Sequence, residues 1–321
     1  MKRLMVAIAV SSVLLTAAGC GTSESGDTST PATDVTFALD FSPDGLHAPA
    51  YVANDKGMFG NKANVTIRPG RGSSNTIKLI DAGRADIGFA DASAVSVGIA
   101  GGAKVKAVGL LMKHNPGVTV VRKDSKAIAI KDLSGMSIGD FPQASTGVLF
   151  PAVLAANGVE IKSVKRVSMA FEARVPSLMT GKVDAIGGYA QEFVTILDQA
   201  RLIPWYENGL DSYGTVIVAN EKFLEENPQA VRAVLRGIEK GLAFTRSSPA
   251  EAAKITAADR RGDATYFERE LEVLKPYFVD PDGLKMQSER WDEVQALMMK
   301  YGGQASKTSD ENLFTNEYLP K

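Results

Sequence analysis

The chain has 321 residues, of which 45% are hydrophobic and 23% are charged, a balance typical of a globular protein with a sizeable buried core. Its formal net charge is −1, so the composition excludes the basic surface that a nucleic-acid-binding protein needs. One cysteine, Cys20, and two histidines, His47 and His114, are too few and too dispersed for a zinc cluster or a disulfide framework. We therefore expect neither nucleic acid nor a metal ion as a partner.

The N-terminus is typical of a signal peptide, which we place at residues 1–19. Lys2 and Arg3 precede an apolar run of about fifteen residues, shorter than the roughly twenty that a membrane-spanning helix needs. Small residues then lead directly to Cys20, and this junction resembles the lipobox of bacterial lipoproteins, in which the cysteine is lipidated and becomes the first residue. Ala17 departs from that pattern, where leucine is more common. We expect export and lipidation of Cys20.

Residues 20–33 are predicted to be a flexible tether. After Cys20 they consist of Gly, Ser, Thr and Pro with a few small or acidic residues, and they contain no large apolar side chain that could join a core. A lipid anchor, a tether and a globular body together place the body outside the cytoplasmic membrane of a bacterium, held close to it. This arrangement favours a protein that captures something extracellular.

Strand and helix patterns alternate along the body, which predicts an α/β protein with mostly parallel sheets. The predicted strands are 35–39, 65–67, 87–89, 137–139 and 164–168, and the helices that follow them are 48–56, 76–82, one starting at 91, 146–157 and 174–180. After a further strand at 216–218 the patterns are helical only, at 228–246, 249–258, 266–274 and 288–301. The C-terminal tail is therefore predicted to be α-helical.

A weak internal repeat suggests that the body has two similar α/β lobes. The motif G-[RK]-x-D occurs at 83–86 and at 181–184, and its two glycines are 98 residues apart. In each copy a predicted helix ends at the glycine, where a positive φ is tolerated, and a buried strand follows the aspartate. The surrounding elements match in order as well.

Four segments in order resemble the NMT1/THI5-like solute-binding proteins. Residues 41–59 resemble the opening signature of that family, a loop with a histidine followed by a helix of the pattern Y-V-A-x-x-K-G-x-F. Residues 83–90, 132–139 and 183–189 resemble three further segments. The resemblance extends from about residue 35 to residue 219 and, less specifically, into the helical tail.

This resemblance implies a two-lobed periplasmic-binding-protein fold of type II, in which the chain crosses between the lobes twice. Lobe 1 would comprise 34–121 plus 214–321, and lobe 2 would comprise 122–213. It further implies that the protein is a monomer that binds a small molecule and delivers it to the permease and ATPase subunits of an ABC importer. No cofactor and no enzymatic activity are expected.

In such a fold the ligand lies between the lobes, where strands end and helices begin. Polar and aromatic residues at five such junctions are the candidate ligand-binding residues: Asp40, Phe41 and His47; Ser73 and Ser74; Asp91; Ser145 and Thr146, at the end of the loop 142–147; and Tyr189 and Glu192. Most of them have a structural alternative. His47, Ser73, Ser74 and Asp91 could simply cap helices, and Glu192 could be the acidic first-turn residue that a helix dipole favours.

The fifth junction carries the most specific chemistry. Gly187 and Gly188 allow a ligand to approach the backbone, and Tyr189 offers a ring for stacking. The carboxylate of Glu192 could accept two parallel hydrogen bonds from an amino-substituted heterocycle. A similar G-G-Y-x-x-E stands at this place in the branch of the resembling family that binds the pyrimidine precursor of thiamine, so the resemblance implies a related small heterocycle.

Two other functions compete with this interpretation. A sulfonate or nitrate would need cations in the cleft, where Arg71 and Lys113 are the candidates and the predicted acids argue against an anion; Arg71 and Arg174 are expected at the surface. A synthase of the thiamine pyrimidine, as in eukaryotic members of the resembling family, would need a cysteine-rich iron-binding stretch, whereas the only cysteine here is at the lipid position. Trp205 and Tyr213 are expected to pack in the core.

Overall fold

The computed structural model describes residues 31–140, 144–260, 262–280 and 283–320. The expected signal peptide, Cys20 and the tether up to residue 30 lie outside these ranges, as do residues 142 and 143 of the fourth junction. None of the helices in the described ranges is long and apolar enough to cross a membrane.

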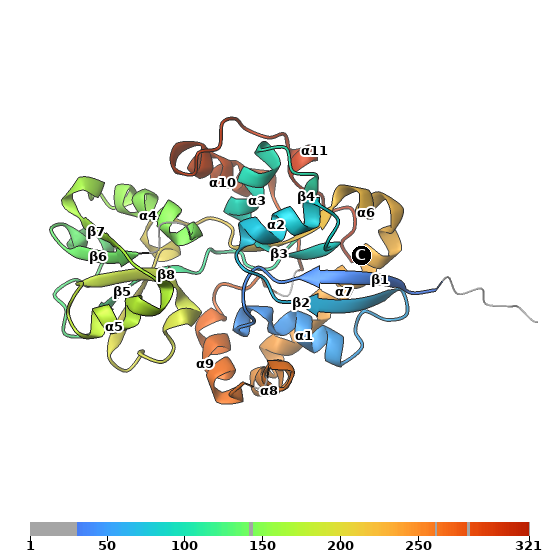
Figure 1. Ribbon diagram of the computed structural model, residues 1–321, viewed down its shortest axis with the longest axis horizontal. Helices are drawn as coiled ribbons and strands as arrows, with labels where there is room; N and C mark the ends of the chain where they lie inside the picture. Colours follow the sequence, from blue (N-terminus) through green and yellow to red (C-terminus); the bar gives the residue numbers. More distant parts are fainter. Residues whose placement is uncertain (1–30, 141–143, 261, 281–282, 321) are drawn as a thin grey trace, which may run out of the picture. The chain divides into compact units, whose positions relative to one another are not determined.

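Two five-stranded sheets organise the described chain (Figure 1). Their strand orders are β2-β1-β3-β10-β4 and β7-β6-β8-β5-β9. One strand runs against its neighbours in each sheet, β10 in the first and β5 in the second, while β1 pairs in parallel with β2 and β3, and β6 with β7 and β8. The strands are β1 (Thr33–Ala38), β2 (Ala63–Arg68), β3 (Ile87–Asp91), β4 (Val105–Leu110), β5 (Gly117–Arg122), β6 (Ser137–Asp140), β7 (Lys165–Ser168), β8 (Ala185–Tyr189), β9 (Ala200–Pro204) and β10 (Thr215–Asn220).

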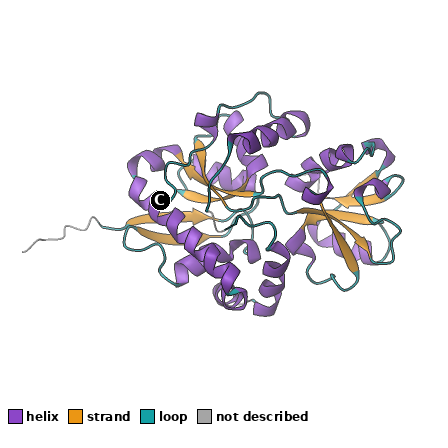
Figure 2. Ribbon diagram, turned by 180° about the vertical axis from the view of Figure 1, so that it is seen from behind, coloured by secondary structure: helices purple, strands orange, loops and turns teal. Residues whose placement is uncertain are grey.

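Helices flank the strands of both sheets (Figure 2), and the prediction of an α/β fold with a helical C-terminal region is confirmed. The α-helices are α1 (Ala48–Asp55), α2 (Ser73–Asp81), α3 (Ala92–Ala100), α4 (Ser145–Ala156), α5 (Arg174–Met179), α6 (Glu221–Glu226), α7 (Pro228–Ser247), α8 (Pro249–Arg260), α9 (Ala264–Leu274), α10 (Ser288–Tyr301) and α11 (Asp310–Leu313). The short 3-10 turns are η1 (Gly45–His47), η2 (Ile130–Leu133), η3 (Ile161–Ser163), η4 (Phe171–Ala173), η5 (Ala190–Phe193) and η6 (Tyr206–Asn208).

The G-[RK]-x-D repeat has the same structural role in both sheets. Gly83 and Gly181 have φ values of 64° and 72°, so each ends its helical segment in the left-handed region that favours glycine. The carboxylate of Asp86 accepts a hydrogen bond from the Thr36 N–H at 2.8 Å, and that of Asp184 accepts one from the Ser137 N–H at 2.8 Å. Each aspartate thus holds the strand it begins, β3 or β8, against the neighbouring β1 or β6.

The chain passes between the two sheets twice. It leaves the first sheet after β4 and enters the second at β5, and it returns after β9 to β10. The two connecting segments are hydrogen-bonded to each other, since the Asn115 N–H donates to the Ser212 carbonyl at 2.8 Å and the Gly214 N–H donates to the Met112 carbonyl at 3.1 Å. In each sheet, the antiparallel strand, β5 or β10, is the first strand that the chain forms after it arrives from the other sheet.

Candidate functional site

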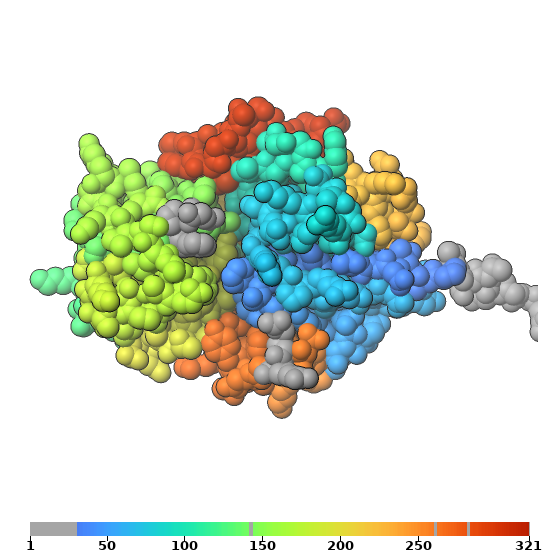
Figure 3. Space-filling model, in the orientation of Figure 1, coloured from blue at the N-terminus to red at the C-terminus, as the bar shows by residue number. Residues whose placement is uncertain are grey.

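A cavity of about 940 Å³ lies where loops of the two sheets meet, a size within the range of small-molecule sites. The loops that follow β1, β2 and β8 contribute to it, so it lies at the carboxyl ends of strands, where open α/β sheets bind ligands. In Figure 3 the blue surface of the first sheet's N-terminal segments faces the green surface of the second sheet in this region. The lining residues are Asp40–Asp44, Leu46, Arg71–Asn75, Lys78, Ala144–Thr146, Phe171, Glu172, Arg174, Tyr189, Gln191, Glu192, Tyr266 and Glu270.

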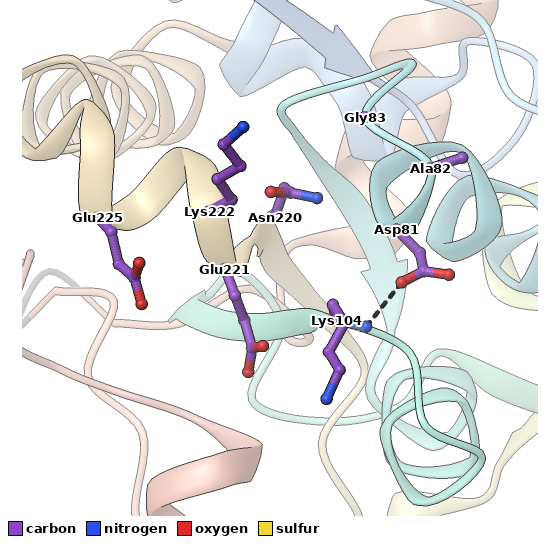
Figure 4. Close-up of a pocket in the computed structure, with 8 residues that line it drawn as sticks. All are labelled: Asp81, Ala82, Gly83, Lys104, Asn220, Glu221, Lys222 and Glu225. Atoms are coloured by element: carbon purple, nitrogen blue, oxygen red, sulfur yellow. Dashed lines mark hydrogen bonds between the residues drawn. The ribbon is translucent and has the colours of Figure 1, made fainter.

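A second hollow of about 490 Å³ lies at the opposite edge of the first sheet (Figure 4). It is bounded by the end of α2, the start of β4 and the start of α6, where the Lys104 N–H donates to Asp81 Oδ1 at 2.7 Å. Charged side chains of both signs, including Lys222 and Glu225, surround it. It contains none of the predicted site residues, so the larger cavity is the candidate site.

Five carboxyl groups line the cavity: Asp40, Asp44, Glu172, Glu192 and Glu270. Glu270 comes from α9 in the helical tail and is 2% exposed. Its Oε2 accepts a hydrogen bond from the Gly45 N–H at 2.7 Å. Burial, and next the negative charge of Asp44, raise the pKa of Glu270 to about 8. The acids on both sides of the cavity make it an environment that favours hydrogen-bond donors and positive charge.

His47 lies behind Asp40 and Asp44, on the side away from the cavity. It is 1% exposed, and its Nε2 donates to Asp40 Oδ1 at 2.7 Å, while Nδ1 lies 3.0 Å from Asp44 Oδ1. Burial lowers the pKa of His47, but the carboxylates of Asp44 and Asp40 outweigh burial and raise it to about 10. His47 belongs to the capping box of η1 and does not line the cavity. Its side chain instead orients two carboxylates that do.

Arg174 and Glu192 form a buried ion pair on the other wall of the cavity. Nη2 of Arg174 donates to Glu192 Oε2 at 2.8 Å, Nη1 donates to the Gly187 carbonyl at 2.5 Å, and Nε donates to the Phe171 carbonyl at 3.3 Å. The expectation that Arg174 is at the surface is wrong, because the residue is 3% exposed. Burial raises the pKa of Glu192, and the charge and hydrogen bond of Arg174 oppose this rise.

Gly188 makes this ion pair possible. A Cβ atom on Gly188 would lie 2.4 Å from Glu192 Oε2 and 2.5 Å from Arg174 Nη1, too close for either atom. The predicted role of Gly188 was to let a ligand approach the backbone; in the structure the space above it holds the ion pair. No atom lies within 4 Å of the corresponding position at Gly187, which therefore keeps open space beside it.

Tyr189 and Asp91 connect the two sheets. The Tyr189 hydroxyl donates to Asp91 Oδ2 at 2.5 Å, and Asp91 also caps α3 by accepting from the Ser93 N–H at 3.0 Å. The two residues are 98 positions apart, the spacing of the internal repeat, and each ends the central strand of its sheet. Tyr189 lines the cavity, whereas Asp91 lies behind it. Burial and the charge of Asp91 raise the pKa of Tyr189 well above its usual range, so the hydroxyl remains a donor.

The predicted serine and threonine residues also line the cavity: Ser73 and Ser74 begin α2, and Ser145 and Thr146 begin α4. Within the described residues, no side chain caps the start of either helix. The Ser73 hydroxyl accepts from the Asp91 N–H at 3.0 Å instead. Hydroxyl-bearing residues at the starts of two helices thus join the acids in the lining of the cavity.

Comparison with known proteins places the chain in a family. The family model described as NMT1/THI5 like matches residues 45–252, more than half of the chain. The chain belongs to the NMT1/THI5 like family. Its relatives include the riboflavin-binding protein RibY of Chloroflexus aurantiacus, 24% identical with 89% of this chain and 86% of the relative covered. A formylaminopyrimidine-binding protein of Halalkalibacterium halodurans is 22% identical, with 88% and 89% covered.

Solved structures share the fold of this NMT1/THI5 like protein. The periplasmic aliphatic sulphonate binding protein SsuA of Escherichia coli superimposes with a TM-score of 0.73 over 87% of this chain and 91% of that chain, at 16% identity. The two-lobed periplasmic-binding-protein fold implied by the sequence resemblance is thereby confirmed.

Several lining residues of this NMT1/THI5 like protein were not among the predicted site residues. Among them are Asp44, Phe171, Gln191, Tyr266 and Glu270. Glu270 had a signal in the sequence, because it is a lone acid within the apolar stripe that Phe267, Leu271 and Leu274 form on α9. Asp44 is a typical turn residue in S-P-D-G, so its pattern did not distinguish it from an ordinary turn.

Four further residues were considered in the sequence as possible neighbours of the ligand, and the structure places one of them in the cavity wall. Trp205 and Tyr213 are 1% and 4% exposed and pack in the core, as predicted, with Trp205 Nε1 donating to Thr119 Oγ1 at 3.0 Å. Lys113 pairs with Asp280 at 2.7 Å and does not line the cavity. Arg71 is exposed, as expected, and contributes to the cavity wall.

Proposed function

We propose that this protein is the extracytoplasmic substrate-binding lipoprotein of an ABC importer and that its ligand is a small flat heterocycle rich in N–H donors, similar to the pyrimidine precursor of thiamine. The observation that carries this proposal is the acidic lining of the 940 Å³ cavity, to which Asp40, Asp44, Glu192 and Glu270 contribute. The names of two relatives, a riboflavin-binding and a formylaminopyrimidine-binding protein, support a heterocyclic ligand.

Carboxylates that are partly removed from water attract ligands that bring hydrogen-bond donors or positive charge, because burying an unpaired charge costs free energy. An aminopyrimidine offers an exocyclic amine beside a ring nitrogen, and once the ring is protonated it presents two donors in parallel. Oε2 of Glu192 already accepts from Arg174 Nη2 at 2.8 Å, so Oε1 would accept only one of these two donors. Asp44, on the opposite wall, would accept a donor at the other edge of the ring.

An anionic ligand such as a sulfonate, which the fold neighbour SsuA binds, fits this lining less well. Arg174 is the buried cation of the described lining, and its charge is already matched by Glu192. Arg71 and Lys78 are exposed and would have to outweigh the acids of the lining. A binding protein rather than a synthase is also supported by the names of the RibY and formylaminopyrimidine-binding relatives, which both describe binding.

The proposed ligand would be held between two lobes, lobe 1 from 34–121 with 214–321 and lobe 2 from 122–213, in a monomeric protein. A ligand that contacts both lobes favours the closed arrangement over an open one, because only the closed arrangement makes both sets of contacts. The Tyr189–Asp91 hydrogen bond and the 3.1 Å bond from Gln191 Nε2 to Asp44 Oδ2 are among the contacts that opening would break.

Glu192→Gln is expected to weaken the binding of formylaminopyrimidine about ten-fold to several hundred-fold. The substitution removes the charge and turns one acceptor into a donor that faces the ligand's donor, and an unpaired buried donor costs roughly 1–3 kcal/mol. Isothermal titration calorimetry measures the change. Glu225→Gln, in the second hollow of Figure 4, is the matched control and should bind within two-fold of wild type. Equal affinities for both variants would remove Glu192 from the site.

Cys20→Ala is expected to release the mature protein from the bacterial membrane. The tether and the body carry no other proposed anchor, and stable attachment depends on the lipid on this cysteine. Cell fractionation followed by immunoblotting measures the partition, with Cys20→Ala compared with wild type at equal expression. Membrane retention that is unchanged in the variant would contradict the lipoprotein assignment while leaving the binding proposal intact.

A further inference from the structure

Two phenylalanines meet at the cavity from different sheets. Phe41 follows β1, and Phe171 begins η4 in the chain segment of the second sheet. Their ring centroids are 6.0 Å apart with an interplanar angle of 39°. Phe41 is 47% exposed and Phe171 is 36% exposed, and both line the cavity. The other exposed large apolar side chains of the described residues, Ile128, Ile161 and Met299, do not line it.

Phe171 is held in place from behind. The Cζ atom of Arg174 lies 4.3 Å from the centroid of the Phe171 ring, and the Arg174 Nε–H donates to the Phe171 carbonyl at 3.3 Å. Arg174 is itself fixed by Glu192 and by the Gly187 carbonyl. One face of the Phe171 ring is therefore covered by a guanidinium that cannot easily move, and the ring is presented toward Phe41 and the cavity.

Exposing two large aromatic rings to water costs free energy unless something covers them. In this position the cover must be flat and apolar on its faces, because the rings come from opposite walls. A ring stacked between two others needs about 3.5 Å on each side, or about 7 Å in all. The present separation of 6.0 Å is only slightly smaller, so a slight parting of the two walls would admit such a ring.

We propose that Phe41 and Phe171 form an aromatic clamp that selects ligands with a planar ring, and that Arg174 positions Phe171 for this contact. The inference rests on the proposed function and deepens it, because the acids would accept hydrogen bonds from the edge of the ligand while the two phenylalanines stack on the faces of its ring. It assigns specificity to Phe171, and it predicts that saturated or non-planar analogues with the same donors bind poorly.

Calorimetry with formylaminopyrimidine, riboflavin and propanesulfonate, on wild type and on three variants, tests the clamp. Phe41→Leu and Phe171→Leu keep an apolar side chain but lose the ring, and each should weaken binding of a flat ligand about ten-fold. Phe171→Tyr keeps the ring and should bind within about three-fold of wild type. Ile128→Ala, an exposed apolar residue away from the cavity, is the control and should leave affinity unchanged. Thermal unfolding of each variant verifies that it folds.

The outcomes separate the clamp from the proposed function. Weaker binding of formylaminopyrimidine by both leucine variants, with recovery in Phe171→Tyr, supports both. Leucine variants that bind a flat ligand within two-fold of wild type overturn the clamp and leave the heterocycle proposal standing. Binding of riboflavin alone, weakened in the leucine variants, supports the clamp and excludes the pyrimidine. Binding of propanesulfonate alone, or of none of the three, overturns both.

Discussion

Replacing Arg174 by methionine is expected to lower the free energy of unfolding by about 3 kcal/mol. Removing one partner of a buried ion pair leaves the other charge without compensation, which typically costs 3–5 kcal/mol. We expect the lower end of that range because 19% of the Glu192 side chain still reaches solvent, against 4% for Arg174. The loss also removes the hydrogen bond to the Gly187 carbonyl, so a buried acceptor loses its partner.

The loss in the free energy of unfolding that Arg174→Met causes should depend on pH. Burial already raises the pKa of Glu192, and removing the arginine that opposes burial raises it further. The folded-state pKa then lies above the unfolded value, so the variant is least destabilised at low pH and loses stability as the pH rises through the folded-state pKa. Urea denaturation at pH 5 and pH 8 should therefore give a smaller difference from wild type at pH 5.

Two further variants make this expectation falsifiable. Arg174→Met combined with Glu192→Leu should recover much of the lost stability, because no uncompensated charge remains. Arg269→Met is the matched control: the Arg269 side chain is 49% exposed and lies 3.9 Å from an Asp198 that is 91% exposed, so its loss should cost less than about 0.5 kcal/mol. If Arg174→Met behaved like Arg269→Met, the buried pair would contribute nothing measurable to folding.

Glu270→Gln is expected to flatten the pH dependence of stability between about pH 5 and pH 8. Burial and the charge of Asp44 raise the pKa of Glu270 from 4.5 to about 8. A raised pKa means that the stability is fully present below pH 4.5 and is lost as the pH rises through 8, by about 5 kcal/mol for a shift of this size. Glutamine cannot ionise, so the variant should be more stable than wild type at pH 8.5 and similar to it at pH 5.

Because of the raised pKa of His47, the free energy of unfolding of the Glu270→Gln variant should still depend on pH. Its pKa is raised from 6.5 to about 10, so its contribution is present below pH 6.5 and is lost as the pH rises through 10. Denaturation curves measured from pH 5 to pH 9 should still decline above pH 6.5 in the variant, less steeply than in wild type. Glu251→Gln, with a side chain 56% exposed, is the control and should follow the wild-type curve. Parallel curves for Glu270→Gln and wild type would show that Glu270 does not titrate in this range.

Local patterns in the sequence were enough to predict the fold class and most elements. The predicted strand at 65–67 and helix at 228–246 agree closely with β2 and α7, because side-chain periods of 2.0 and 3.6 are properties of the local backbone. The turn glycines, Gly83 and Gly181, were recognisable for the same reason, since a positive φ is a local requirement. The repeat motif also predicted two similar α/β units, and the structure has two sheets with corresponding strand orders.

Three strands had no adequate local signal. β4, β5 and β9 were not predicted, and β5 is almost entirely buried, with the sequence GVTVVR. A strand buried on both faces lacks the alternation of polar and apolar residues, so its sequence alone does not distinguish it from other short apolar runs. Its pairing with β8 and β9, more than sixty residues further along the chain, is what makes it a strand.

The sequence by itself determined the class of the fold and most of the junctions that line the cavity. Only the tertiary structure decided how those residues are used. It buries Arg174 against Glu192, brings Glu270 to Gly45 across 225 residues, and sets Phe41 opposite Phe171. The physical reason is that burial and charge pairing depend on partners distant in the chain, and no local period or turn signal encodes such a contact.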